Sequence, residues 1–103
     1  MLHNYTPHDV NIVDGPTFKS EGVARIQQAD IVESEIDGVL IYGQYFGEPE
    51  GLPDPKPGEC FIVSRMVAEA CSDRRDLYVP GPLVRDEKGA VIGCKGLSYI
   101  KER

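Results

Sequence analysis

The chain has 103 residues, of which 41% are apolar, and its formal net charge is −6. This length is typical of one domain, residues 1–103, and this apolar content excludes an intrinsically disordered chain. The acidic balance argues against binding of a nucleic-acid backbone or an anionic membrane surface, because both require a basic face. Eleven Gly and eight Pro indicate short strands and many turns rather than a helix bundle.

The cysteines and the apolar runs indicate the compartment. Cys60, Cys71 and Cys94 are odd in number and lack C-x-x-C spacing, so the sequence predicts neither a zinc site nor a redox pair. No basic and then apolar leader opens the sequence, and no apolar run approaches the roughly 18 residues of a membrane span. We therefore expect a reduced cytoplasmic protein without a metal or other cofactor.

The first half of the chain predicts strands that are joined by turns. Alternation of apolar and polar residues indicates the first strand, and Asp37-Gly38 is a strong signal for a two-residue hairpin turn. The run after this turn is apolar on both sides at its start, so we predict that it forms a central strand. The strands are expected at about 9–13, Val23–Ile26, Ala29–Ile36 and Val39–Phe46, with a loop at Thr17–Gly22.

The strongest local pattern lies in residues 58–81. Cys60–Val63 is a short apolar run after Pro57-Gly58, which is typical of a buried strand. Ser64 suits a helix N-cap and apolar residues then recur at helical spacing, so a helix is expected over about 64–73. A second strand begins at Leu77 and ends at Pro80-Gly81. The side chains expected in the core are Phe61, Ile62, Val63, Val67, Ala70 and Cys71.

The remaining segments complete the predicted fold. Glu48–Gly58 contains four prolines and is expected to be an extended loop, and Asp86–Gly89 is expected to be a hairpin turn with Gly89 at positive φ. Gly93–Gly96 is expected to be a bulge before a last strand, Leu97–Ile100. The fold class predicted is α+β: a small, mostly antiparallel sheet or half-open β-barrel of six to eight short strands, with one main helix at about 64–73. Several edge strands in so small a chain predict a homo-oligomer, most simply a two-fold dimer.

Several short motifs that are spread over nearly the whole chain form one combination. They are Thr6-Pro7-His8, Gly22–Arg25, Gly51–Pro55, Ile62–Ser64 with Val67-Ala68, Pro80-Gly81, Val84–Asp86 and Gly93-Cys94. This combination resembles a family of small uncharacterised proteins from bacteriophages, prophages and actinobacterial genomes. The resemblance implies a phage or mobile-element setting, and therefore the host cytoplasm, but it implies no activity. Small phage-encoded domains often bind a host component or a signalling nucleotide, so the context suggests an anti-defence sponge that captures a nucleotide-type immune signal.

Ser64-Arg65 is the polar pair best placed to bind an anion. It lies where a strand is expected to run into a helix, so unpaired backbone N–H groups and the helix dipole favour a negative ligand there. Arg65 could clamp a phosphate with two hydrogen bonds. The alternative is a plain N-cap followed by a solvated arginine, and no glycine-rich phosphate loop accompanies the pair. His8, which follows a proline in a turn, and Arg85, which begins a hairpin turn, complete the predicted ligand-binding site.

Other polar and aromatic residues are explained more simply as structural. Arg74-Arg75 would favour the C-terminal end of the helix dipole, with Asp73 and Asp76 as surface partners of small consequence. His3 is expected in a mobile terminus, which makes a metal site with His8 improbable. Cys94 is expected to be the most exposed thiol, but no base is locatable beside it. The aromatic residues expected to pack or to line an interface are Tyr42, Tyr45, Phe46 and Tyr78.

Two functions from different classes therefore remain open. The first is a non-enzymatic binding module that captures a small anionic molecule, because arginines are dispersed through an acidic chain. The second is an interaction module that docks on a host or phage protein through the acidic, proline-rich face at Glu48–Pro57. A small hydrolase ranks third, because no triad, carboxylate pair or cluster of metal ligands is legible in the sequence.

Overall fold

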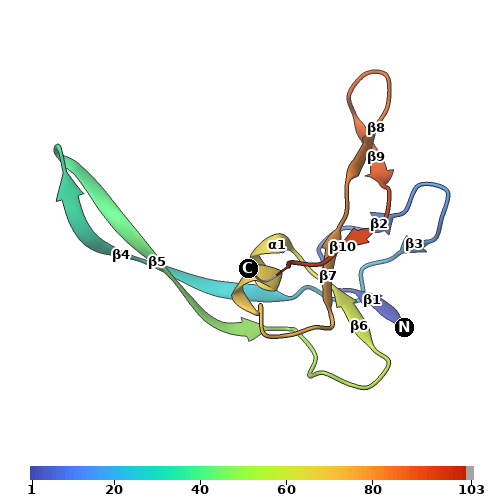
Figure 1. Cartoon of the computed structure of the whole chain (residues 1–103), viewed down its shortest axis with the longest axis horizontal. Coiled ribbons are helices and arrows are strands. Elements are labelled where there is room, and N and C mark those ends of the chain that lie inside the picture. The colour runs from blue at the N-terminus through green and yellow to red at the C-terminus, as the bar shows by residue number, and fades with distance from the viewer. Residues whose placement is uncertain (102–103) are drawn as a thin grey trace.

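A computed structural model describes residues 1–101 of the chain (Figure 1). Strands are the main secondary structure of these residues, which also contain one short helix, and this agrees with a sheet-rich α+β class. No helix in this described part is long and apolar enough to cross a membrane. The elements are β1 (Leu2–Asn4), β2 (Val10–Asn11), β3 (Thr17–Phe18), β4 (Arg25–Ile36), β5 (Val39–Glu50), β6 (Cys60–Ile62), α1 (Arg65–Ala70), β7 (Leu77–Pro80), β8 (Leu83–Arg85), β9 (Val91–Cys94) and β10 (Leu97–Ser98).

The centre of the molecule is a four-stranded sheet with the order β1-β6-β7-β10. Both β1 and β7 run parallel to β6, whereas β10 pairs antiparallel with β7. Parallel neighbours need a crossover connection, and the segment that contains α1 supplies it between β6 and β7. The predicted strand–helix–strand unit is confirmed, and β1 is a strand that the sequence pattern did not predict.

The helix is shorter than expected. Ser64 is its N-cap, as predicted, and the Ser64 hydroxyl accepts a hydrogen bond from the backbone N–H of Val67 at 3.4 Å. The helix ends at Ala70 rather than near residue 73, because the Arg74 N–H donates to the Cys71 carbonyl at 2.9 Å and closes a tight turn. The chain then turns back towards β7.

The core lies between α1 and the central sheet. Of the six predicted core residues, five are buried, and Val63 and Val67 are no more than 1% exposed. Ala70 is only half-buried and Ala68 takes its place, so the buried face of α1 is rotated slightly from the predicted one. The main buried cluster consists of Ala24, Phe61, Val63, Val67, Ala68, Cys71, Leu77 and Val79.

A long two-stranded hairpin, β4 with β5, projects from this body (Figure 1), and we call residues 25–50 the arm. Its turn is Asp37-Gly38 as predicted, with positive φ angles of 52° and 77° at the two residues, as a type I′ turn requires. The strands expected at Val23–Ile26 and Ala29–Ile36 are instead one continuous strand from Arg25 to Ile36, with irregular pairing between Ile26 and Gln28 and between Val32 and Ser34. The prediction of a central strand at Val39–Phe46 is wrong, because this strand pairs only with β4 and is exposed.

No sheet among residues 1–101 closes into a barrel, so that part of the fold prediction is corrected. Besides the central sheet, these residues form three separate two-stranded ribbons, β2-β3, β4-β5 and β8-β9, and the strands exceed the expected six to eight. The ribbons are antiparallel, but the central sheet is mainly parallel. The Cα radius of gyration is 16.5 Å, whereas about 13 Å is typical of a compact domain of this length. The arm accounts for this extension, because it lies outside the packed body.

The N-terminal segment is fixed in the fold rather than mobile. Asn4 on β1 is fully buried, and its amide donates to the carbonyls of His8 at 2.8 Å and Phe18 at 2.9 Å. Its side-chain oxygen accepts from the backbone N–H of Thr6 at 2.9 Å and from the Thr6 hydroxyl at 2.7 Å. The expected loop at Thr17–Gly22 contains β3, which pairs with β2. Asn4 thus joins β1 to the segment that follows it and to β3.

The thiol expected to be most exposed is buried. Cys94 is only 3% exposed, because β9 packs beside β2 and the Sγ atom lies 3.6 Å from the carbonyl oxygen of Asn11. The neighbouring Gly93 is also in close contact with Asn11, so the glycine allows this approach of two backbones. Of the three cysteines, Cys60 is the one that is half-buried.

Candidate functional site

The sequence-predicted pair Ser64-Arg65 lies at the start of α1. Ser64 is half-buried and serves as the N-cap, whereas the Arg65 side chain is 69% exposed and pairs with Glu69 one turn along the helix at 3.4 Å. The helix has only six residues, so its dipole is short. This geometry matches the alternative of an N-cap followed by a solvated arginine.

The other two predicted site residues lie on separate segments. The His8 side chain is exposed, and its backbone carbonyl accepts hydrogen bonds from Asn4 and Thr6. Arg85 is exposed at the end of β8 and donates to the Gly89 carbonyl across the hairpin at 2.9 Å. Within residues 1–101, no hydrogen bond or ion pair joins His8 or Arg85 to Ser64 or Arg65. The four-residue site stays a prediction, and the structure offers another candidate.

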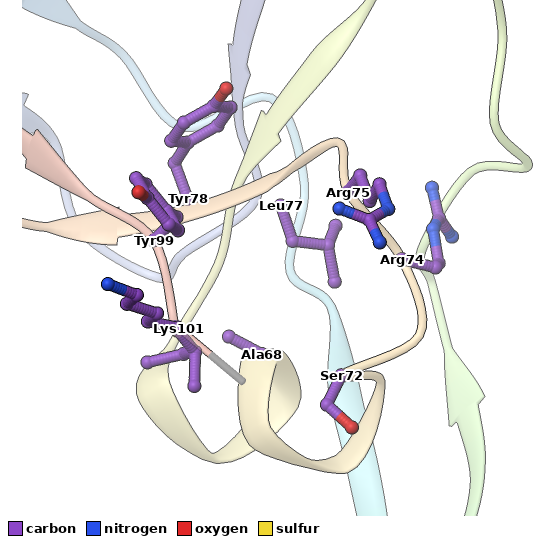
Figure 2. Close-up of a pocket in the computed structure, with 9 residues that line it drawn as sticks. Ala68, Ser72, Arg74, Arg75, Leu77, Tyr78, Tyr99 and Lys101 are labelled. Carbon is purple, nitrogen blue, oxygen red and sulfur yellow. The ribbon is translucent and has the colours of Figure 1, made fainter. Parts of the chain in front are cut away.

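A cavity of about 490 Å³ lies between the end of α1, β7 and the C-terminal segment (Figure 2). This volume is within the range of small-molecule sites, roughly 300–1,000 Å³. Figure 2 shows Arg74 and Arg75 on the loop side of this cavity, and Tyr99 and Lys101 on the side of the C-terminal segment. The lining residues are Ala68, Ser72, Arg74, Arg75, Leu77, Tyr78, Tyr99, Ile100 and Lys101.

Arg74 is the structural cation of this cavity. Its guanidinium binds the Asp76 carboxylate with two hydrogen bonds, at 3.0 and 2.6 Å, and donates a third to the Pro53 carbonyl at 3.0 Å. The pair is largely buried, and the bonds to Arg74 hold the pKa of Asp76 below its usual range. Arg74 also lies 5.9 Å from the centre of the Phe61 ring. The expectation of a surface pair of small consequence is therefore wrong for Arg74 and Asp76.

Arg75 and Lys101 are the cations of the cavity that remain for a ligand. The four ion pairs found within residues 1–101 include neither of them. Both side chains are exposed at the cavity, so they keep their hydration until a ligand arrives. A guanidinium and an ammonium on residues that line one cavity suit a phosphate or carboxylate group, because both form charge-assisted hydrogen bonds with such oxygens.

Two tyrosines give the cavity an aromatic wall. Strands β7 and β10 pair with Leu97 opposite Pro80 and Ser98 opposite Val79. Tyr78 and Tyr99 adjoin this paired segment and both line the cavity. Tyr78 is half-buried and Tyr99 is 67% exposed, so ring surface is available to a ligand. An aromatic group of a ligand could stack there.

A second cavity, of about 300 Å³, contains a cluster of titratable side chains that the sequence did not indicate. His3 lies between two carboxylates, with Nδ1 2.9 Å from Glu21 and Nε2 2.5 Å from Glu59. The hydrogen bond to Glu59, followed by the one to Glu21, raises the pKa of His3 above its ordinary 6.5. The bond between His3 and Glu59 also lowers the pKa of Glu59. Both ring nitrogens are occupied, so His3 ties β1 to two other segments and has no nitrogen left to act as a base.

Within the part of the chain that the structure describes, no three His, Cys, Asp or Glu side chains are grouped so that they could hold a metal ion. Comparisons with known proteins add no relative: no family, no curated protein and no solved structure matches this chain. The family suggested by the sequence motifs therefore stays a prediction.

The cavity residues carry little local signal in the sequence. The sequence explains Arg75 by the helix dipole, and Tyr99 and Lys101 follow a short strand without any recognisable motif. They line the same cavity as Arg75 because β10 pairs with β7. The single usable clue in the sequence is Arg74-Arg75, which stands one residue before an apolar strand.

Proposed function

We propose that the protein is a non-enzymatic binding module that captures a small anionic molecule of nucleotide type in the cavity between α1, β7 and the C-terminal segment. The observation that carries this proposal is the combination of two available cations with two tyrosines around one cavity. A nucleotide presents the complementary parts, since its phosphates suit Arg75 and Lys101 and its base suits the rings of Tyr78 and Tyr99.

The cavity favours binding over catalysis. Among the residues that the structure describes, its lining contains hydroxyl groups, cations and apolar groups, but no carboxylate, histidine or thiol that could act as a general base or nucleophile. The titratable cluster at His3 lines the other cavity and is internally bonded. In the phage or mobile-element setting that the sequence resemblance suggests, such a module would act in the host cytoplasm by sequestering a nucleotide-derived immune signal.

The first experiment separates capture from turnover. The purified protein is incubated with cyclic dinucleotides and cyclic ADP-ribose isomers, freed of unbound ligand and denatured, and the released molecules are analysed by mass spectrometry. Recovery of an unchanged nucleotide supports capture, and recovery of an altered one shows an enzyme. Absence of any retained nucleotide contradicts the proposal.

The second experiment locates the site with two matched arginines. Arg75→Ala removes a cation that lines the cavity, and we expect a loss of about 1.5–3 kcal/mol of binding free energy, or about ten- to a hundred-fold in affinity. Arg65→Ala removes an exposed arginine that lines neither cavity, so affinity should not change. The opposite result would instead support the site predicted from the sequence at Ser64-Arg65.

A second candidate function is docking on another protein, and the exposed arm is the observation that favours it. The face predicted for docking, Glu48–Pro57, begins in the last residues of β5 and continues into a largely exposed loop. The larger apolar surface lies further along the arm, where both strands carry exposed aliphatic and aromatic side chains. A chain that retains no nucleotide but binds a protein partner through this arm would establish the second function.

A further inference from the structure

The arm carries large apolar side chains on both of its faces. The residue pairing places Ile31, Ile36, Val39, Ile41 and Tyr45 on one face, because the extra residue Glu33 in β4 brings Ile36 to the same side as Ile31. The opposite face carries Val32, Leu40, Tyr42 and Phe46. All nine side chains are between 38% and 59% exposed.

Nothing in the described part of the chain covers these side chains. Contact with the main core extends to Ile26 at the base of the arm, and beyond that point the two strands have only each other. An isolated two-stranded ribbon is marginally stable in water, and contiguous exposed apolar surface of this kind marks an interaction site. The arm therefore requires a partner surface.

Charge indicates what that surface is. The arm contains six acidic residues and one arginine, Arg25, a formal charge of −5, and no Lys, Arg or His occurs between Ile26 and Pro55. Outside the arm the chain carries ten Lys and Arg residues and eleven Asp and Glu residues, a formal charge of −1. Packing of one arm on another would bring two strongly acidic surfaces together, whereas packing on the body of a second copy brings an acidic surface to a nearly neutral one that holds the cations.

The β8–β9 hairpin is the part of the body that fits the arm best. It exposes Leu83, Val91 and Ile92, each about half exposed, and Lys88 and Lys95 flank them. Of its two acidic turn residues, Asp86 accepts from the backbone N–H groups of Lys88 at 2.8 Å and Ala90 at 3.0 Å, whereas Glu87 is exposed. With three basic residues against these two, the hairpin from Leu83 to Lys95 has a formal charge of +1 beside its apolar surface.

We propose that the protein forms a two-fold dimer in which the arm of each copy packs on the β8–β9 hairpin of the other. Figure 1 shows the arm and this hairpin projecting from different sides of the body, so the arm does not pack on the hairpin of its own copy. A two-fold arrangement uses both surfaces of both copies and closes the assembly. The proposal is independent of the nucleotide cavity, whose residues belong to neither surface.

A charge-swap experiment tests this arrangement. Variant one, Asp30→Lys with Glu35→Lys, makes the arm less acidic, and variant two, Lys88→Glu with Lys95→Glu, makes the hairpin acidic. We expect wild type to sediment as a dimer and each variant alone to dissociate at least about ten times more readily, because the introduced side chains then face side chains of the same sign across both interfaces. An equimolar mixture should restore the dimer, since the two lysines introduced on one arm then meet the two glutamates introduced on the other copy's hairpin, and the unchanged arm meets the unchanged hairpin. All four positions are exposed, and a cooperative urea transition confirms that each variant folds.

Three results would overturn the proposal. Wild type that remains a monomer at high concentration excludes the dimer. If variant two dimerises like wild type, the hairpin is not the surface that binds the arm. Packing of one arm on the other would give this result. Two folded monomeric variants that do not recombine exclude charge-matched docking of arm on hairpin.

Discussion

Replacement of Asn4 by alanine should destabilise the protein severely, although the residue is polar and stands near the N-terminus. The fully buried Asn4 side chain makes four hydrogen bonds, to the carbonyls of His8 and Phe18 and to the N–H and hydroxyl of Thr6. A protein hydrogen bond contributes about 1 kcal/mol net, so Asn4→Ala should lower the free energy of unfolding by about 4 kcal/mol. A domain of this size has a total of roughly 5–15 kcal/mol. The loss corresponds to a fall in Tm of roughly 15–30 °C.

The assay is urea unfolding followed by far-UV circular dichroism, because the chain has no tryptophan. Asn11→Ala is the matched control, since Asn11 is exposed and its side chain bonds only Ile92 and Thr17 among residues 1–101. We expect the control to lose less than about 1 kcal/mol. Equal losses in the two variants, or a loss under about 1 kcal/mol for Asn4→Ala, would refute the view that buried hydrogen bonds of Asn4 hold β1 in place.

Val67→Asp should prevent folding by burying an unpaired charge, whereas Met66→Asp should fold because Met66 is 47% exposed; circular dichroism of both variants shows whether α1 faces the core as described. The raised pKa of His3 means that its bonded imidazolium stabilises the fold fully below about pH 6.5 and loses this effect as the pH rises through the raised value. Urea midpoints should accordingly fall as the pH rises above about 6.5, and a His3→Gln variant with the same pH dependence would contradict this assignment. In the native protein a thiol reagent should modify Cys60 first and reach Cys94 only on unfolding, and rapid labelling of Cys94 would show that β9 does not cover it.

Turn and cap chemistry was predictable because it depends on neighbouring residues. Asp37-Gly38 forms the hairpin turn, Ser64 caps the helix, and Gly89 adopts a positive φ of 84°. The strand–helix–strand unit followed from the same local signals. These features can be predicted without knowing which distant segment lies beside them.

Strand pairing and exposure were not predictable, because the sequence pattern does not identify the partner. The apolar run at Val39 has the same pattern whether the strand is central in a sheet or lies in an uncovered arm. Strand β1 has only three residues, too few for a periodic signal, and His3 finds its carboxylates at positions 21 and 59. For the same reason the cavity that joins Arg75 to Tyr99 left no motif in the sequence.

The parallel pairing of β1 with β6 has a consequence for folding during synthesis. Leu2 pairs with Cys60, 58 positions later, so β1 leaves the ribosome long before its partner exists. The pairing of β4 with β5, in contrast, is local in the sequence, so this hairpin can begin to form once Glu50 has emerged. The central sheet can assemble only after β7 has emerged, and until then the apolar arm is exposed on an unfolded nascent chain. The order of translation therefore favours formation of the arm before that of the body that anchors it.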